Sequence, residues 1–108
     1  MNTDIKEYSI VISDDAKNSF ANHILFLKSF DVILAKNIAT SIINAIETLK
    51  YFPNRNPYFN EEYITKNKYH KMFVEKYYLI IYQIKYETVY VEIILDCRSD
   101  YTWIVSKF

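Results

Sequence analysis

The sequence predicts an α+β domain with the element order β-α-α-β-β-β, in which a helical hairpin packs on one face of a mostly antiparallel four-stranded sheet. Three observations lead to this class. An alternating segment opens the chain, two segments with helical periodicity follow it, and three strand-like segments lie in the last third. The length of 108 residues suits one domain, so we expect residues 1–108 to form a single unit.

The first half of the chain carries the first strand and both helices. Residues 7–13, EYSIVIS, alternate in polarity, which predicts a strand with one buried face. Ser13 and the two aspartates after it provide an N-cap and early negative charge for a helix over about residues 14–29. Asp31 can cap a second helix, which Pro53 ends. Because only a residue or two separates the helices, we expect an antiparallel hairpin.

The second half begins with a loop and continues with three strands. The loop, residues 53–67, holds two prolines and four asparagines. Strand-like segments follow at 69–74, 77–84 and 88–95, and their short links predict β-hairpins. The middle segment is nearly all apolar or aromatic, so it is expected at the centre of the sheet. The tail DYTWIVSKF predicts either a short helical turn or another strand.

One face of this sheet is expected to stay open, because the helical hairpin covers only the other face. Alternation along the last strand places four side chains on the open face: Tyr90, Glu92, Asp96 and Arg98. The segment IILDCRSDY therefore runs from a buried strand to a charged rim. At that rim Arg98 either pairs with Asp96 or Asp100, or is presented for binding or catalysis.

Composition narrows the function classes. Thirteen basic residues balance thirteen acidic ones, so the totals do not indicate a strongly cationic nucleic-acid binder. The chain has no glycine, so glycine-rich phosphate-binding loops are not expected. Its one cysteine, Cys97, excludes an internal disulfide, fits a reducing compartment and is expected to act as a small buried hydrophobe.

Neither a membrane segment nor a cofactor site is expected. No cationic start precedes an apolar run, and the longest apolar stretches are expected to fall far below the roughly 20 residues of a membrane helix. We therefore expect a cytoplasmic protein without a membrane partner. His23, His70 and Cys97 lack the spacing of a metal site, so no metal or other cofactor is expected. His23 is expected to be a partly buried helix residue.

Phosphodiester cleavage without a metal needs a base, an acid and cations for the phosphorane charge. Arg98 suits the charge, His70 or Tyr101 can move protons, and Lys71 can hold phosphates. These groups would converge if the first and last of the three C-terminal strands present them at one end of the open face. The lysine-rich segment 66–76 is either a solvated strand edge or a patch that faces phosphates.

Five segments in order resemble the RelE/ParE superfamily of toxins from type II toxin–antitoxin modules. They are YSIVIS, DDAKNSF, AIETLKYFPNRNPY, YHKMFVEKYYLIIYQI and VYVEIILDCRSDY, and together they extend over residues 7–101. The resemblance implies a compact sheet with two helices on one face, as in microbial ribonucleases. It also implies a toxin linked to growth inhibition and plasmid stabilisation, held inactive by a cognate antitoxin that wraps an extended segment around it.

Two activities occur in that superfamily. RelE-type members cut mRNA in the ribosomal A site, whereas ParE-type members poison DNA gyrase and have lost the nuclease set. By resemblance, Arg98 matches the arginine after the last strand, and Tyr101 lies near the C-terminal tyrosine. His70 falls where the family often carries a basic or acid–base residue. Lys68 and Lys71 would hold the RNA backbone.

Three hypotheses follow from the residues and the resemblance together. The first is a metal-independent, ribosome-dependent endoribonuclease, or mRNA interferase, with Arg98 at the phosphorane. The alternative is a gyrase poison without nuclease activity. Leu79, where the family often has an arginine, and a formal net charge of +0 both favour this alternative. The third is a degenerate member that binds its antitoxin and is not toxic.

Overall fold

A computed structural model describes residues 5–98, which form the predicted four-stranded sheet. The strands are β1 (Ser9–Ile12), β2 (His70–Val74), β3 (Tyr78–Lys85) and β4 (Thr88–Asp96). Their order in the sheet is β1-β4-β3-β2. β1 runs parallel to β4, whereas β2–β3 and β3–β4 are antiparallel. The expected α+β class and mostly antiparallel sheet are confirmed, with every strand end within two residues of the expected one.

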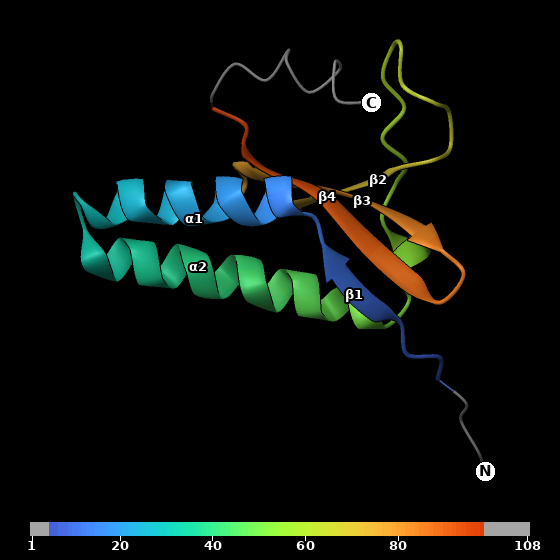
Figure 1. Cartoon of the computed structure of the whole chain (residues 1–108), viewed down its shortest axis with the longest axis horizontal. Helices are drawn as coiled ribbons and strands as arrows, with labels where there is room; N and C mark the ends of the chain where they lie inside the picture. The colour runs from blue at the N-terminus through green and yellow to red at the C-terminus, as the bar shows by residue number, and fades with distance from the viewer. Residues whose placement is uncertain (1–4, 99–108) are drawn as a thin grey trace.

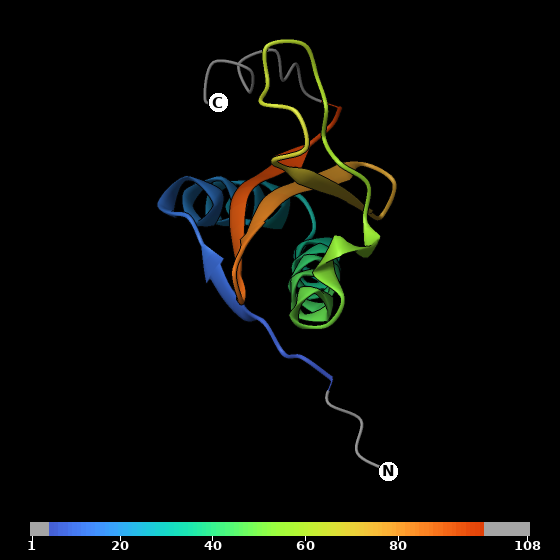
Figure 2. The ribbon, with the colours of Figure 1, turned by 90° about the vertical axis from the view of Figure 1, so that its right-hand side faces the viewer.

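The two helices form the expected hairpin (Figure 1). α1 spans Asp14–Lys28 and α2 spans Val32–Glu47. Ser13 caps α1 and Asp31 caps α2, and each side chain accepts a hydrogen bond of 3.0 Å from the N–H three residues later. Both predicted caps are therefore confirmed. The hairpin lies against one face of the sheet, with its turn beyond the strands (Figures 1 and 2).

The main core lies between the hairpin and this face of the sheet. Apolar side chains from α2, the short 3-10 turn η1 (Thr48–Lys50) and the three C-terminal strands fill it. Its fully buried members include Ile42, Leu49, Ile80, Tyr82, Val89 and Val91. These residues follow the helical and alternating periodicities of the sequence, so the pattern was sufficient to predict this core.

The opposite face of the sheet is not open, and that expectation is wrong. A second core forms there, in which Phe59, Ile64 and Tyr69 from the long loop cover the strands. The strand residues beneath them are Leu79, Ile81, Ile93 and Leu95. The physical reason is the composition of β3, which is apolar on both faces, so both faces need cover from water. The loop starts with a second 3-10 turn, η2 (Pro53–Arg55).

A bulge in β4 changes which side chains share a face. The pairing of β3 with β4 shifts between Ile81 and Tyr82, whose partners are Ile93 and Val91, so Glu92 is the extra residue. Beyond the bulge the alternation is inverted. Glu92 bonds to Gln83, whereas Asp96 points to the helical side. The prediction that Asp96 shares a face with Glu92 is therefore wrong.

Among the described residues 5–98, one segment is long and apolar enough to cross a membrane, judged by length and composition alone. It is the 19-residue segment Val32–Lys50, which consists of α2 and η1. The expectation that every apolar stretch is far too short is therefore wrong. Core helices of folded domains meet the same criterion, and Ala35, Ile42, Ile46 and Leu49 of this segment are buried. One side of the segment packs in the main core, and 22% of the apolar window is buried.

Candidate functional site

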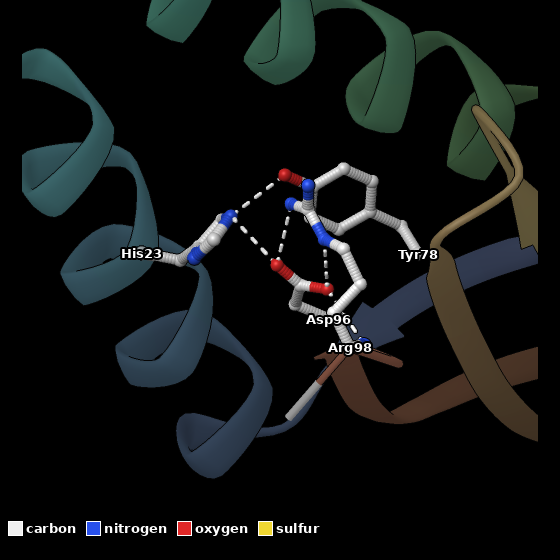
Figure 3. A network of polar contacts seen from close by, with 4 residues as sticks. All are labelled: His23, Tyr78, Asp96 and Arg98. Carbon is white, nitrogen blue, oxygen red and sulfur yellow. Dashed lines mark hydrogen bonds and ion pairs between the residues drawn. The ribbon is translucent and has the colours of Figure 1, made fainter. Parts of the chain in front are cut away.

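Four polar side chains meet where β4 ends (Figure 3). His23 comes from the middle of α1, Tyr78 opens β3, Asp96 ends β4 and Arg98 follows two residues later. Tyr78 and Asp96 are paired residues of neighbouring strands, so their side chains leave the sheet on the same face. The bulge at Glu92 turns Asp96 toward α1, and this brings the four residues together. We call these four residues the His23 cluster.

Arg98 is tied to Asp96 by three hydrogen bonds. The Arg98 Nε and Nη2 atoms donate to the two carboxylate oxygens at 3.0 and 2.7 Å, and the Arg98 backbone N–H donates at 2.9 Å. These bonds hold the pKa of Asp96 below its usual value against the opposing effect of burial, and they raise the pKa of Arg98. The Arg98 guanidinium also lies 4.8 Å from the ring centroid of Tyr77. The interpretation in which Arg98 pairs with Asp96 is confirmed.

His23 is a neutral partner in this cluster. Its Nε2 atom lies 2.7 Å from the Tyr78 hydroxyl oxygen and 3.9 Å from Asp96 Oδ2. Burial lowers the pKa of His23, and Arg98 lowers it further, although Asp96 acts in the opposite sense. The lowered pKa favours the uncharged imidazole, which weakens any ion pair with Asp96. Burial also raises the pKa of Tyr78, so its hydroxyl keeps its proton.

Cys97 lies between the two residues of the ion pair but faces the second core. Burial raises the pKa of its thiol, and the nearby Asp96 carboxylate raises it further. A protonated, partly buried thiol is a poor nucleophile. Cys97 therefore packs as a small hydrophobe, as expected from the sequence.

His70 is far from Arg98, and the expected convergence of the two is wrong. β2 and β4 are both antiparallel to β3, so they run in the same direction, and the start of β2 lies at the other end of the sheet from the end of β4. His70 pairs with Tyr82, four residues along β3 from Tyr78, which is a separation of about 13 Å along the strand. His70 is buried, its Nδ1 atom lies 2.8 Å from Asn56 O, and its ring stacks on Tyr82. Its contacts are those of a core residue.

Lys68 and Lys71 do not join Arg98 either. Lys71 is half-buried in β2 next to His70, and the Lys68 ammonium lies 5.2 Å from the centroid of the Tyr69 ring. Both are near the start of β2, which is the His70 end of the sheet. Tyr101 lies outside the described residues. Within residues 5–98, no group of three His, Cys, Asp or Glu side chains is arranged to hold a metal ion.

Sequence reasoning missed His23 and Tyr78 as members of a site. The helical periodicity correctly predicted that His23 is partly buried, but no spacing connects it to residues 55 and 73 positions away. The cluster can fasten α1 to the ends of two strands, because its donors and acceptors are matched. It also holds a half-exposed guanidinium, with a side-chain exposure of 54%, at the rim of the sheet.

The fold is therefore two antiparallel helices on a mixed sheet of order β1-β4-β3-β2. The chain is similar to a chain of a solved structure described as "Chromosomal ParDE TA system from P. aeruginosa". The TM-score is 0.70, the identity is 11%, and the match covers 84% of this chain and 97% of that chain. At this identity the likeness shows the fold alone. No protein-family model matches the sequence, and no curated protein matches it.

Proposed function

We propose that this chain is the toxin of a type II toxin–antitoxin module, and that a cognate antitoxin neutralises it. The observation that carries the proposal is the fold likeness to a chain of a ParDE system, which extends over 84% of this chain. The ordered segments that resemble RelE/ParE toxins support the same class from the sequence. We place the toxin in the cytoplasm, where the two targets considered below are found.

For the target, we propose DNA gyrase, bound without chemistry of the toxin's own. The carboxylate of Asp96 neutralises Arg98, and His70 is buried at the other end of the sheet. Leu79 stands where nuclease relatives often carry an arginine, and thirteen basic residues balance thirteen acidic ones. A toxin that acts by binding a protein needs neither an acid–base pair nor excess positive charge, so these features fit a ParE-type activity.

Ribosome-dependent mRNA cleavage is the second candidate, and the half-exposed Arg98 at the rim favours it. In this candidate Arg98 leaves Asp96 to stabilise the phosphorane, and Tyr101 moves a proton. Lys68 and Lys71 hold the RNA backbone from the His70 end of the sheet. His70 has only a packing role here, because its ring is buried between Tyr82 and the loop.

Controlled expression tests the proposed class. The chain is expressed from a tightly repressed promoter, alone and together with the product of the neighbouring reading frame. We expect that frame to encode a small protein with a DNA-binding half and a disordered half. Growth should stop with the chain alone and resume with both. A complex without growth arrest would identify a degenerate member. If the chain neither stops growth nor forms a complex, the proposal is overturned.

Two assays on the purified protein separate the targets. Gyrase supercoiling should be inhibited, while mRNA in a reconstituted translation reaction should stay intact when its 5′ ends are mapped by primer extension. The Arg98→Ala variant is the matched control. If mRNA is cut only in the presence of the ribosome and the cuts disappear with Arg98→Ala, the activity is mRNA cleavage and not gyrase poisoning.

A further inference from the structure

One carboxylate oxygen of the His23 cluster faces two basic groups. Asp96 Oδ2 accepts a hydrogen bond of 2.7 Å from Arg98 Nη2, and it lies 3.9 Å from His23 Nε2 (Figure 3). The Arg98 guanidinium is always charged, whereas an imidazole gains its charge only when the pH falls. Asp96 is therefore shared between a permanent cation and a group whose charge depends on pH.

The hydrogen bonds of His23 depend on its protonation state. In the uncharged ring, the Tyr78 hydroxyl, 2.7 Å from Nε2, can donate to this nitrogen or accept from it. In the charged ring Nε2 always carries a hydrogen, and Asp96 Oδ2 is then an anionic acceptor within about 1 Å of hydrogen-bond length. Protonation of His23 therefore creates a competitor of Arg98 for Asp96.

The surroundings of His23 contribute one carboxylate and one guanidinium. Burial lowers the pKa of His23, and the charges that act on it come from Asp96, which raises this pKa, and from Arg98, which lowers it. The Tyr78 hydroxyl is the third titratable group at the ring, and burial raises its pKa, so it stays uncharged. The residues of α1 three and four positions away are uncharged: Ser19, Phe20, Phe26 and Leu27. So are all residues of α2 that are not exposed: Ala35, Ile38, Ala39, Ser41, Ile42, Ala45 and Ile46.

Arg98 is more free to move than His23. His23 lies in the middle of α1, and its ring packs edge to face on Tyr78 with the centroids 5.2 Å apart. The Arg98 side chain is half-exposed, and its guanidinium lies 4.8 Å from the centroid of the Tyr77 ring, a contact that does not need Asp96. Two cations beside one carboxylate also repel each other. These features favour the departure of Arg98 when His23 is charged.

We propose that Asp96 is the centre of a proton-dependent switch, which holds the Arg98 guanidinium while His23 is uncharged and releases it when His23 gains a proton. The imidazole takes up one proton, Nε2 donates to Oδ2, and the two guanidinium hydrogen bonds to Asp96 are lost. The bond from the Arg98 backbone N–H stays and keeps the carboxylate in place. The released guanidinium is then an unpaired positive charge at the rim of the sheet. This inference is independent of the proposed function, because it concerns residues of this chain alone.

Nuclear magnetic resonance of the isotope-labelled full chain follows each group directly, because the sequence holds only two histidines and two arginines. The ring signals of His23 and the guanidinium carbon and nitrogen shifts of Arg98 are recorded from about pH 8 down to the pH at which the domain unfolds in acid. We expect the Arg98 shifts to change with the same midpoint as the His23 ring. Arg55 is the internal control, because its guanidinium donates to carbonyl oxygens and to the Thr48 hydroxyl. Its shifts should stay constant.

Two variants test the competition from either side. Arg98→Gln should raise the proton affinity of His23 about fivefold or more, because the coupling between two sites is reciprocal. His70 lies at the other end of the sheet, so its ring signals should be the same in this variant and in the wild type at every pH. His23→Gln removes the titrating group and keeps a side chain that can bond to Tyr78. In this variant the Arg98 shifts should stay constant over the range in which they change in the wild type.

The wild type alone can overturn the switch, so the test does not depend on whether a variant folds. If the Arg98 shifts stay constant while His23 titrates, the two groups do not compete for Asp96. If the Arg98 shifts change only where the Asp96 carboxyl carbon titrates, protonation of Asp96 itself releases the guanidinium. If the Arg55 shifts move together with those of Arg98, or the domain unfolds before His23 titrates, no switch operates in the folded protein. An unchanged proton affinity of His23 in folded Arg98→Gln would contradict the proposal equally.

Discussion

Asp96 accepts three hydrogen bonds from Arg98, one of them from its backbone. A carboxylate in this position stabilises the folded state only while it is ionised, because its pKa is lowered on folding. The stabilisation is fully present above the unfolded pKa of about 3.8 and is lost as the pH falls through the lower folded value. The free energy of unfolding therefore decreases as the pH is lowered through that range.

The variant Asp96→Asn should lower the free energy of unfolding at pH 7 by about 1–3 kcal/mol, because a charge-assisted pair is removed from a partly buried site. Urea unfolding followed by circular dichroism measures this change. Below pH 4 the difference from the wild type should shrink. Glu87→Gln is the control, because Glu87 pairs with Lys6 at 4.0 Å on the surface and should change stability by less than about 1 kcal/mol. Equal effects of the two variants would contradict the structural role of Asp96.

The composition of this cluster could not be predicted from alternation alone. Without the bulge at Glu92, Asp96 would lie on the face away from His23. A bulge inserts one extra residue into one of two paired strands. Glycine often indicates the position of a bulge, and this chain has no glycine. The pairing of Asp96 with Arg98 was predictable, in contrast, because two residues of opposite charge follow closely after a strand.

At the scale of elements, the absence of glycine means that other residues must take positive φ angles in the turns. Within residues 5–98, six residues take positive φ angles that glycine usually occupies: Phe52, Tyr63, Asn67, Glu75, Lys76 and Tyr86. Apart from asparagine, such residues adopt this conformation at a cost of roughly 1–2 kcal/mol each. The tight hairpin turns are therefore sites of local strain that packing elsewhere offsets.

Tyr86→Gly should raise the free energy of unfolding by about 0.5–1 kcal/mol, since glycine adopts a φ of 57° without strain and part of the gain is lost to unfolded-state entropy. Tyr86 is 96% exposed, so no packing is removed. Thermal unfolding measures the change. Glu87→Gly, at the adjacent position without a positive φ, is the control and should lower stability. A destabilised Tyr86→Gly would show that the turn is not strained.

The relative direction of β2 and β4 was predictable from the order of the strands in the sequence. The prediction that His70 and Arg98 converge did not take this direction into account. Two consecutive hairpins make the first and third strands parallel. The start of the first strand must then lie far from the end of the third. The connection of β1 to the sheet was less predictable, because β1 pairs in parallel with β4, the last strand in the sequence.

At the scale of the whole molecule, the two cores share the central strands. Alternate residues of β3 belong to the core beneath the helices and to the core beneath the loop. The sequence made this arrangement predictable in one respect, because β3 is apolar on both faces. It did not show which segment covers the second face, since Phe59 and Ile64 lie in a loop rich in asparagine and without periodicity. Cores that share strands should unfold together.

Phe59→Ala tests this coupling of the cores. Phe59 is 4% exposed, so its truncation should lower the free energy of unfolding by about 3–5 kcal/mol. Urea unfolding should remain a single transition, with the same midpoint by circular dichroism and by tyrosine fluorescence. Tyr63→Ala is the control from the same loop, because Tyr63 is 84% exposed and its change should be within about 0.5 kcal/mol. If the loop were only laid over the sheet, Phe59→Ala would instead leave the main transition unchanged.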